Sequence, residues 1–151
     1  MYPTLLAIHG IFRWAALILL LIATYRAWRG YTLGKIFSKG DNSTRHWTAT
    51  VIQVQMVVGF VLYNYSPFAK SFWSDASVPG DGSMFFAIIH ATMMFAAVII
   101  VSIGSAMAKR RPTDHEKYKT MLTWFAIALL VILVAIPWPF SPFAQRPLIR
   151  L

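Results

Sequence analysis

Four long apolar runs, separated by short polar segments, dominate the pattern of this chain. The runs cover residues 4–24, 48–65, 84–107 and 121–138. Each is close to the ~20 residues that a helix needs to cross the hydrocarbon core of a bilayer. The chain is 58% hydrophobic and only 13% charged, a balance that is too apolar for an ordinary soluble domain. The pattern predicts an all-α fold, a bundle of four transmembrane helices that forms one integral membrane domain over residues 1–151.

The second half of the chain repeats features of the first. The segment HGIFRWAALILLLIA (9–23) aligns with HATMMFAAVIIVSIG (90–104), which shares the histidine, an aromatic residue five positions later and the Ala-Ala pair that follows. The motif Ser-Pro-Phe-Ala follows the second apolar run at 66–69 and recurs after the fourth at 141–144. Because the matches come in the same order, we expect the bundle to consist of two repeated helical hairpins.

Basic residues are placed unevenly along the chain, which has a formal net charge of +9. Most lie after the first and third apolar runs, whereas the segment after the second run holds Lys70 beside Asp75 and Asp81. Short loops rich in Lys and Arg stay in the cytoplasm, so both termini are expected on the periplasmic side of a bacterial inner membrane. The charge is therefore a topology signal, and we expect no nucleic-acid partner. The residues expected in the cytoplasm are Arg26, Arg29, Lys35, Lys39, Arg45, Lys109, Arg110, Arg111, Lys117 and Lys119.

Two histidines lie inside apolar runs, His9 near the start of the first and His90 near the start of the third. Positions seven residues apart share one face of a helix, and the face of each histidine carries small residues. Such residues mark the faces along which membrane helices pack. We therefore expect both imidazoles to point into the bundle, at nearly the same depth. The small residues are Ala16, Ala23 and Gly30 on the first helix, and Ala97 and Gly104 on the third.

An inward histidine pair at one depth can ligate a single metal from opposite sides. Haem iron suits such a pair, because axial histidine ligation is common and helical bundles build cofactor sites from facing helices. Zinc suits it poorly, since the chain has no cysteine and no carboxylate in the membrane interior to add further ligands. The pattern predicts a non-covalent haem b with His9 and His90 as its metal ligands. The alternative is that each histidine only hydrogen-bonds to a neighbouring helix.

Three more residues are candidates for binding the same cofactor. Arg13 lies one turn from His9, and a cation at this depth needs a partner such as a haem propionate or a quinone carbonyl, or else solvation by helix carbonyls and water. Met94, one turn beyond His90, could contact a porphyrin, although filling the core is the common role of methionine. Gly59 is expected at the depth of His9, where its backbone would admit a flat ring or a closely packed helix.

Four other polar side chains raise alternatives. Gln53 and Gln55 need polar partners in lipid surroundings, either a quinone or, as we favour, a neighbouring helix. His46 and His115 would make a second ligand pair if they met, and the protein would then hold two haems. The repeat aligns His46 with Met121 instead, and His115 lies within a basic segment that is typical of a solvated surface. We therefore expect one haem.

At AIHGIFRWAAL (7–17), RHWTATVIQVQ (45–55) and AIPWPFSPFA (135–144) the sequence resembles small four-helix bacterial membrane proteins described as cytochrome b-like. Its layout is also similar to that of copper-resistance-D-type proteins and small diheme cytochromes b. The resemblance spans nearly the whole chain and implies a b-type haem, with His9 and His90 as the matching ligands. Larger cytochromes b carry four ligand histidines inside helices, and this chain has two.

These features lead to one functional expectation and two alternatives. We expect a membrane-bound b-type cytochrome that relays electrons to or from a quinone, an electron-transfer protein rather than a stand-alone enzyme. Its partners would be the lipid bilayer and a quinone or redox protein, within a homodimer or a respiratory complex. The first alternative is a cofactor-free membrane subunit or scaffold of a larger complex. The second is a small membrane oxidase that depends on haem or quinone.

Overall fold

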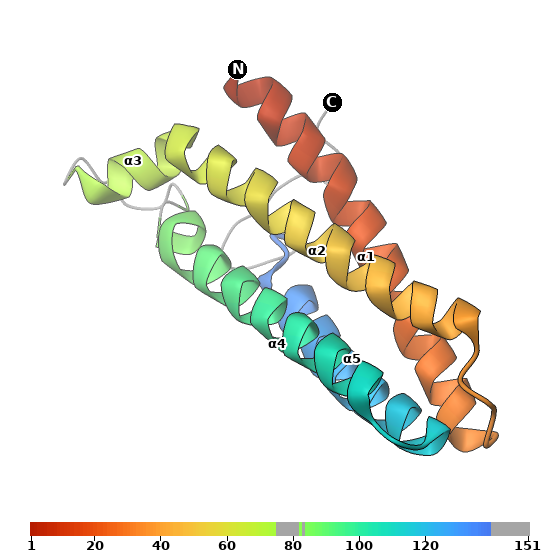
Figure 1. Cartoon of the computed structure of the whole chain (residues 1–151). Coiled ribbons are helices and arrows are strands. Elements are labelled where there is room, and N and C mark those ends of the chain that lie inside the picture. Colours follow the sequence, from red (N-terminus) through yellow and green to blue (C-terminus); the bar gives the residue numbers. More distant parts are fainter. Residues whose placement is uncertain (75–81, 83, 140–151) are drawn as a thin grey trace.

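The computed structural model of the chain describes residues 1–74, 82 and 84–139, and the regular structure among these residues is entirely helical (Figure 1). Four segments are long and apolar enough to cross a bilayer, with bounds Tyr2–Thr32, Lys39–Tyr65, Phe85–Arg110 and Asp114–Ala135. The all-α, four-helix prediction is confirmed, and the chain is a multi-pass membrane protein. The elements are α1 (Tyr2–Thr32), α2 (Lys39–Tyr65), α3 (Pro67–Trp73), the π-helical turn η1 (Phe85–His90), α4 (Ala91–Arg110) and α5 (Asp114–Ala135).

The helices extend past the apolar runs on the side of the basic loops, where side-chain caps fix their starts. The Ser38 hydroxyl accepts a hydrogen bond from the Asp41 N–H, and the Asp41 carboxylate accepts one from the Ser38 N–H in return. Thr113 caps α5 by accepting from the Glu116 N–H. At its other end α5 stops at Ala135, three residues before the predicted boundary. Pro137 disfavours helical geometry at Ile136, whose ψ is 130°.

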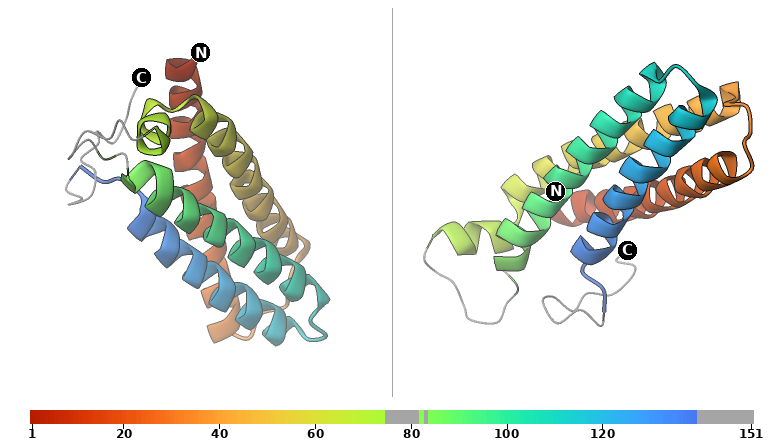
Figure 2. Two further views of the ribbon diagram at one scale, coloured as in Figure 1. Left: turned by 90° about the vertical axis from the view of Figure 1, so that its left-hand side faces the viewer. Right: turned by 90° about the horizontal axis from the view of Figure 1, so that it is seen from below.

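The helices form two hairpins that lie side by side (Figures 1 and 2). α1 packs on α2 and on α5, and α4 packs on α5 and on α2, so α1 and α4 are diagonally opposite. The connections 33–38 and 111–113 lie together at what we call the hairpin end. The N-terminus, α3 and η1 lie at the opposite, open end (Figure 1). This arrangement agrees with the two predicted hairpins, although the second Ser-Pro-Phe-Ala motif at 141–144 lies outside the described residues.

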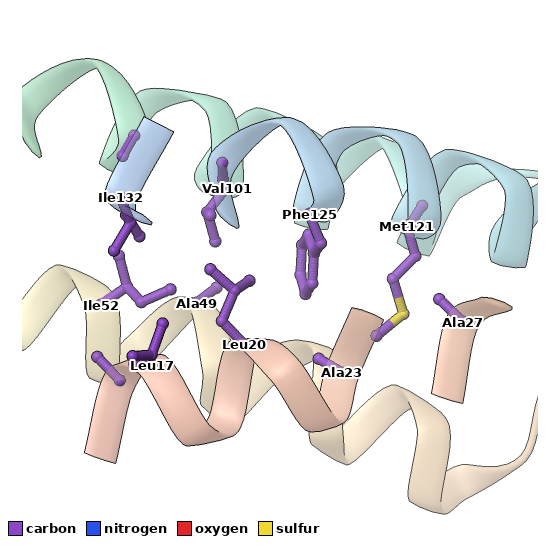
Figure 3. Packing of buried hydrophobic residues seen from close by; sticks show 14 of the residues in the cluster. Leu17, Leu20, Ala23, Ala27, Ala49, Ile52, Val101, Met121, Phe125 and Ile132 are labelled. Carbon is purple, nitrogen blue, oxygen red and sulfur yellow. The ribbon is translucent and has the colours of Figure 1, made fainter. Parts of the chain in front are cut away.

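Small residues let the helices approach closely along the predicted faces. Ala16, Ala23 and Ala97 are buried, and the core around them draws on all four long helices (Figure 3). Gly30 lies against the ring of Tyr118, and Gly104 lies against Trp124, so that a Cβ atom at either glycine would overlap the aromatic side chain. The predicted small-residue faces are therefore the packing faces of α1 and α4.

A buried carboxylate ties three segments together at the hairpin end. The Asp41 carboxylate accepts hydrogen bonds from the Arg26 Nε at 2.9 Å, the Tyr118 hydroxyl at 2.7 Å and the Ser38 hydroxyl at 2.6 Å. Asp41 is only 7% exposed. We call Arg26, Ser38, Asp41 and Tyr118 the Asp41 cluster. Its donors come from α1, from the cap of α2 and from α5, so it fixes the relative positions of these helices.

Candidate cofactor site

The two membrane histidines meet at the open end of the bundle. The ring centroids of His9 and His90 are 6.4 Å apart, and the ring planes are nearly perpendicular, at 75°. His9 lies in α1, and His90 ends η1, directly before α4. The two imidazoles therefore reach toward each other from diagonally opposite helices, which confirms the predicted inward direction and matched depth. We call these two residues the histidine pair.

His90 is oriented by the end of α5. Its Nδ1 donates a hydrogen bond to the Ala135 carbonyl at 2.8 Å. The last carbonyls of a helix have no partner within the helix, and α5 ends at Ala135, so this oxygen is available to a side chain. With the proton on Nδ1, the lone pair of the neutral ring lies on Nε2. Nε2 is therefore the atom of His90 that can bind a metal.

The backbone that carries His90 is a π-helical turn. Such turns are rare, and they occur often at functional sites. The Tyr63 hydroxyl of α2 donates to the Ala87 carbonyl within this turn at 3.0 Å, and the Trp73 indole N–H donates to the Tyr63 oxygen at 2.9 Å. The rings of Phe85 and Phe86 lie 5.9 and 6.1 Å from that of His90. The turn thus places His90 in aromatic surroundings and is anchored to α2.

His9 faces α2, where a glutamine and a glycine lie one turn apart. The Gln55 Nε2 donates to the His9 carbonyl at 3.0 Å and lies 3.4 Å from the His9 Nε2. A Cβ atom at Gly59 would lie 3.2 Å from the His9 Cε1, so the missing side chain makes room for the ring. Gly59 is therefore at the depth of His9, as expected from the sequence. Gln55 bonds a neighbouring helix, and so does Gln53, whose Nε2 donates to the Ser102 hydroxyl at 2.9 Å.

Two polar atoms at this site lack a partner. Among the described residues, His9 Nδ1 and Gln55 Oε1 are buried without a hydrogen bond. Buried polar groups in folded proteins are nearly always satisfied, and the penalty for leaving one unsatisfied is about 1–3 kcal/mol. His9 Nδ1 lies beside Gly59, 3.6 Å from the position of a Cβ atom there. Such a site is suited to a further ligand that uses the imidazole nitrogen.

The spacing of the histidine pair fits a single metal centre between the rings. With metal–nitrogen bonds of ~2 Å, two imidazoles on opposite sides of one metal have ring centres ~6–6.5 Å apart. The observed separation of 6.4 Å lies in this range. No group of three or more His, Cys, Asp or Glu side chains gathers anywhere in the described part of the chain. The donor set is thus two neutral nitrogens, which suits an iron whose other ligands come from a macrocycle.

The structure places Arg13 and Met94 near the site in different settings. Arg13 is half-buried, and its guanidinium carbon lies 5.5 Å from the centre of the Trp14 ring. Together with Trp14, Leu17, Ile136, Pro137 and Trp138 it lines a recess that is too narrow to hold a water molecule. Met94 packs on the edge of the hydrophobic core. Arg13 is thus near the end of α5 that orients His90, while the contact found for Met94 is a packing contact.

The other two histidines lie on the surface. His46 and His115 are both exposed. The ring of His46 contacts the adjacent Trp47 at 5.6 Å, and that of His115 stacks on Tyr31 at 4.5 Å. Neither has the half-buried setting of the histidine pair.

Sequence reasoning missed the groups that hydrogen-bond to the two histidines. Pro137 signals the end of α5 and therefore free carbonyls near residue 135, but the sequence does not tell which side chain they meet. Gln55 was expected to bond a neighbouring helix, and its spacing of four residues from Gly59 places both on one face of α2. That face meets His9 only because of how α1 and α2 pack.

Comparison with protein families, curated proteins and solved structures finds no match for this chain. Its function is therefore inferred from its own residues.

Proposed function

We propose that this protein is a membrane-bound b-type cytochrome that holds one non-covalent haem b between His9 and His90 and relays electrons. The observation that carries the proposal is the meeting of two imidazoles from diagonally opposite helices, with ring centres 6.4 Å apart. It is supported by the His9 Nδ1, which is buried without a hydrogen bond among the described residues. Haem would supply one-electron chemistry, which the side chains of this site lack.

The chain's own residues would bind and tune the cofactor. The Ala135 carbonyl keeps the proton of His90 on Nδ1 and so leaves Nε2 for iron. Phe85 and Phe86 surround that ligand with apolar rings, which lowers the local dielectric. Arg13 would offset the negative charge of the haem propionates, and Met94 would contact the macrocycle. Electrons would pass to or from a quinone or a redox protein, within a homodimer or a respiratory complex.

A cofactor-free scaffold is the competing function, because His90 and Gln55 already make hydrogen bonds between helices. In a scaffold the polar groups of the interior would hydrogen-bond only to one another. The unpartnered His9 Nδ1 and Gln55 Oε1 do not fit that role, since a purely structural network would satisfy them. The same two atoms favour a bound ligand.

One visible spectrum tests the proposal. The full chain, expressed with ample haem supply and purified in detergent, should show a low-spin b-type spectrum that changes on reduction with dithionite. Metal analysis should give one iron per chain. His9→Ala and His90→Ala should each remove the low-spin spectrum, leaving apoprotein or a haem that binds carbon monoxide. Wild-type protein without haem would contradict the proposal and favour the scaffold.

The membrane orientation is part of the same proposal. The basic residues at the hairpin end favour a cytoplasmic position for that end, which would put both termini and the histidine pair on the periplasmic side of a bacterial inner membrane. Cysteine substitutions at Ser38 and Ser74 give a direct test. An impermeant thiol reagent applied to intact cells should label the Ser74 variant and leave the Ser38 variant unlabelled. The reverse pattern would invert the orientation.

A further inference from the structure

We infer that Gln55 is a positioning residue for His9: its side-chain amide orients this imidazole as the Ala135 carbonyl orients that of His90. The inference rests on the proposed function, because orientation matters for a ligand to iron. It goes beyond that function by assigning the two haem ligands different supports, a fixed main-chain carbonyl for His90 and a rotatable side chain for His9.

The first support is position. The Gln55 amide nitrogen lies 3.4 Å from the His9 Nε2, and the same nitrogen donates to the His9 carbonyl at 3.0 Å. The amide is thus held against the residue that it would orient. The other neighbour of this ring on α2 is Gly59, which has no side chain and cannot hydrogen-bond to it.

The second support is the pair of unpartnered atoms. A neutral imidazole that binds metal through one nitrogen carries its proton on the other, and this N–H needs an acceptor. The acceptor half of the Gln55 amide, Oε1, is buried without a partner, as is one nitrogen of the His9 ring. Rotation of the amide would turn Oε1 toward the ring nitrogen that Nε2 now faces. This rotation would give up the bond from the amide nitrogen to the His9 carbonyl. The buried Oε1 would instead accept from the N–H at the ring Nε2, and Nδ1, the ring nitrogen that has no hydrogen bond among the described residues, would be left to bind iron.

The consequence for the cofactor follows from electron density. A hydrogen bond from the ligand N–H to a carbonyl makes the imidazole a stronger donor to the metal. A carboxylate in place of the amide would strengthen this effect and favour ferric iron, which lowers the midpoint potential. Loss of the acceptor would weaken it and raise the potential.

The chain offers a matched control on the same helix. Gln53 is two residues from Gln55 and has the same side chain. It also hydrogen-bonds to a neighbouring helix, but its partner is the Ser102 hydroxyl of α4 and not His9. A substitution there removes a polar contact between helices without touching His9. Any effect that is specific to Gln55 therefore reports on the ligand.

The test compares Gln55→Glu, Gln55→Met and Gln53→Met in the full-length protein, by spectroelectrochemical titration and by haem transfer to an acceptor protein. We expect a lower midpoint potential in Gln55→Glu, a higher one in Gln55→Met, and wild-type behaviour in Gln53→Met. Haem affinity in Gln55→Met should fall by ~10–100-fold, the usual effect of losing such an outer partner. Circular dichroism checks that each variant is folded, and if Gln55→Met does not accumulate, the near-isosteric Gln55→Glu decides.

Two outcomes overturn the inference, and they are distinguishable. If wild-type protein carries haem and both Gln55 variants match Gln53→Met in potential and affinity, Gln55 has no positioning role and the cytochrome proposal stands. If wild-type protein carries no haem, the proposed function fails and the inference fails with it.

Discussion

At the hairpin end, Asp41 accepts hydrogen bonds from Ser38, Arg26 and Tyr118, whereas at the open end His9 Nδ1 and Gln55 Oε1 have no hydrogen bond within the described part of the chain. Both regions bury polar side chains where helices of the bundle meet. In the Asp41 cluster the contacts of Asp41 with Arg26 and Tyr118 join α2 to α1 and α5, so the cluster serves the fold. At the histidine pair the contacts are incomplete, because His9 Nδ1 and Gln55 Oε1 have no hydrogen bond among the described residues.

The difference teaches how to separate structural from functional polar groups in a membrane bundle. Burial alone does not separate the two kinds of polar group, because both regions contain buried polar atoms between helices. Hydrogen bonding does separate them. A structural polar group has partners for its polar atoms, whereas a binding group keeps one polar atom available for a ligand. Substitutions at the hairpin end should therefore change stability without changing the cofactor, and those at the open end should do the reverse.

The largest effect is expected at Gly30. A side chain here would overlap the ring of Tyr118, so Gly30→Leu should separate α1 from α5 and cost about 3 kcal/mol or more. The measurement is thermal unfolding in detergent, together with size-exclusion chromatography. The control is Gly10→Leu, since no other atom lies within 4 Å of a Cβ at Gly10. Equal stability of the two variants would contradict the packing of α1 on α5.

A smaller effect is expected from Asp41→Asn. The Arg26 side chain is 42% exposed, so the ion pair itself contributes less than ~1 kcal/mol. The buried bonds from Tyr118 and Ser38 to the charged carboxylate bring the total loss to about 1.5–3 kcal/mol. The melting temperature should fall while the haem spectrum stays unchanged. Asp114→Asn is the control, because its pair with Lys117 is longer, at 3.6 Å, and partly exposed. A changed haem spectrum in Asp41→Asn would contradict the conclusion that the hairpin end affects stability alone.

Gly59→Ala should change haem binding and leave the stability of the fold nearly unchanged. The added Cβ would lie 3.2 Å from the His9 Cε1, so the imidazole must shift by a few tenths of an ångström. Alanine favours a helix over glycine by roughly 1 kcal/mol, which offsets the crowding in the stability of the fold. We expect nearly unchanged unfolding but weaker haem binding or a shifted spectrum. Gly10→Ala, which adds the same group in open space, should leave the haem unchanged. Wild-type haem binding in Gly59→Ala would show that His9 tolerates the displacement.

The smallest effects are expected from His46→Ala and His115→Ala. Both side chains are exposed, so each substitution should change stability by less than ~0.5 kcal/mol and leave the haem content at one per chain. Pyridine haemochrome quantification checks the stoichiometry. Loss of half the haem in either variant would mean two haems and a cofactor at the hairpin end as well.

Much of the fold was predictable because its signals are local. Run length predicts four spanning helices, and the seven-residue spacing of Ala16, Ala23 and Gly30 predicts which face of α1 packs. The depth of the histidine pair follows from counting along two helices. The orienting groups were not predictable, because Gln55 meets His9, and Ala135 meets His90, only through the packing of separate helices. The early end of α5 depends on Pro137, whose restriction on Ile136 outweighs the apolar pattern.

The π-helical turn before His90 has a counterpart in the sequence of the first half. The residues that lead to His9 read LLAIH (5–9), whereas those that lead to His90 read FFAIIH (85–90), with one additional isoleucine. A π-helical bond spans five residues where an α-helical bond spans four, so a single inserted residue can be absorbed within one turn. In a straight α-helix the insertion would rotate every preceding residue by ~100° about the axis. The extra residue, absorbed in the π-helical turn, leaves Phe85 and Phe86 beside His90 without rotating them to another face of the helix.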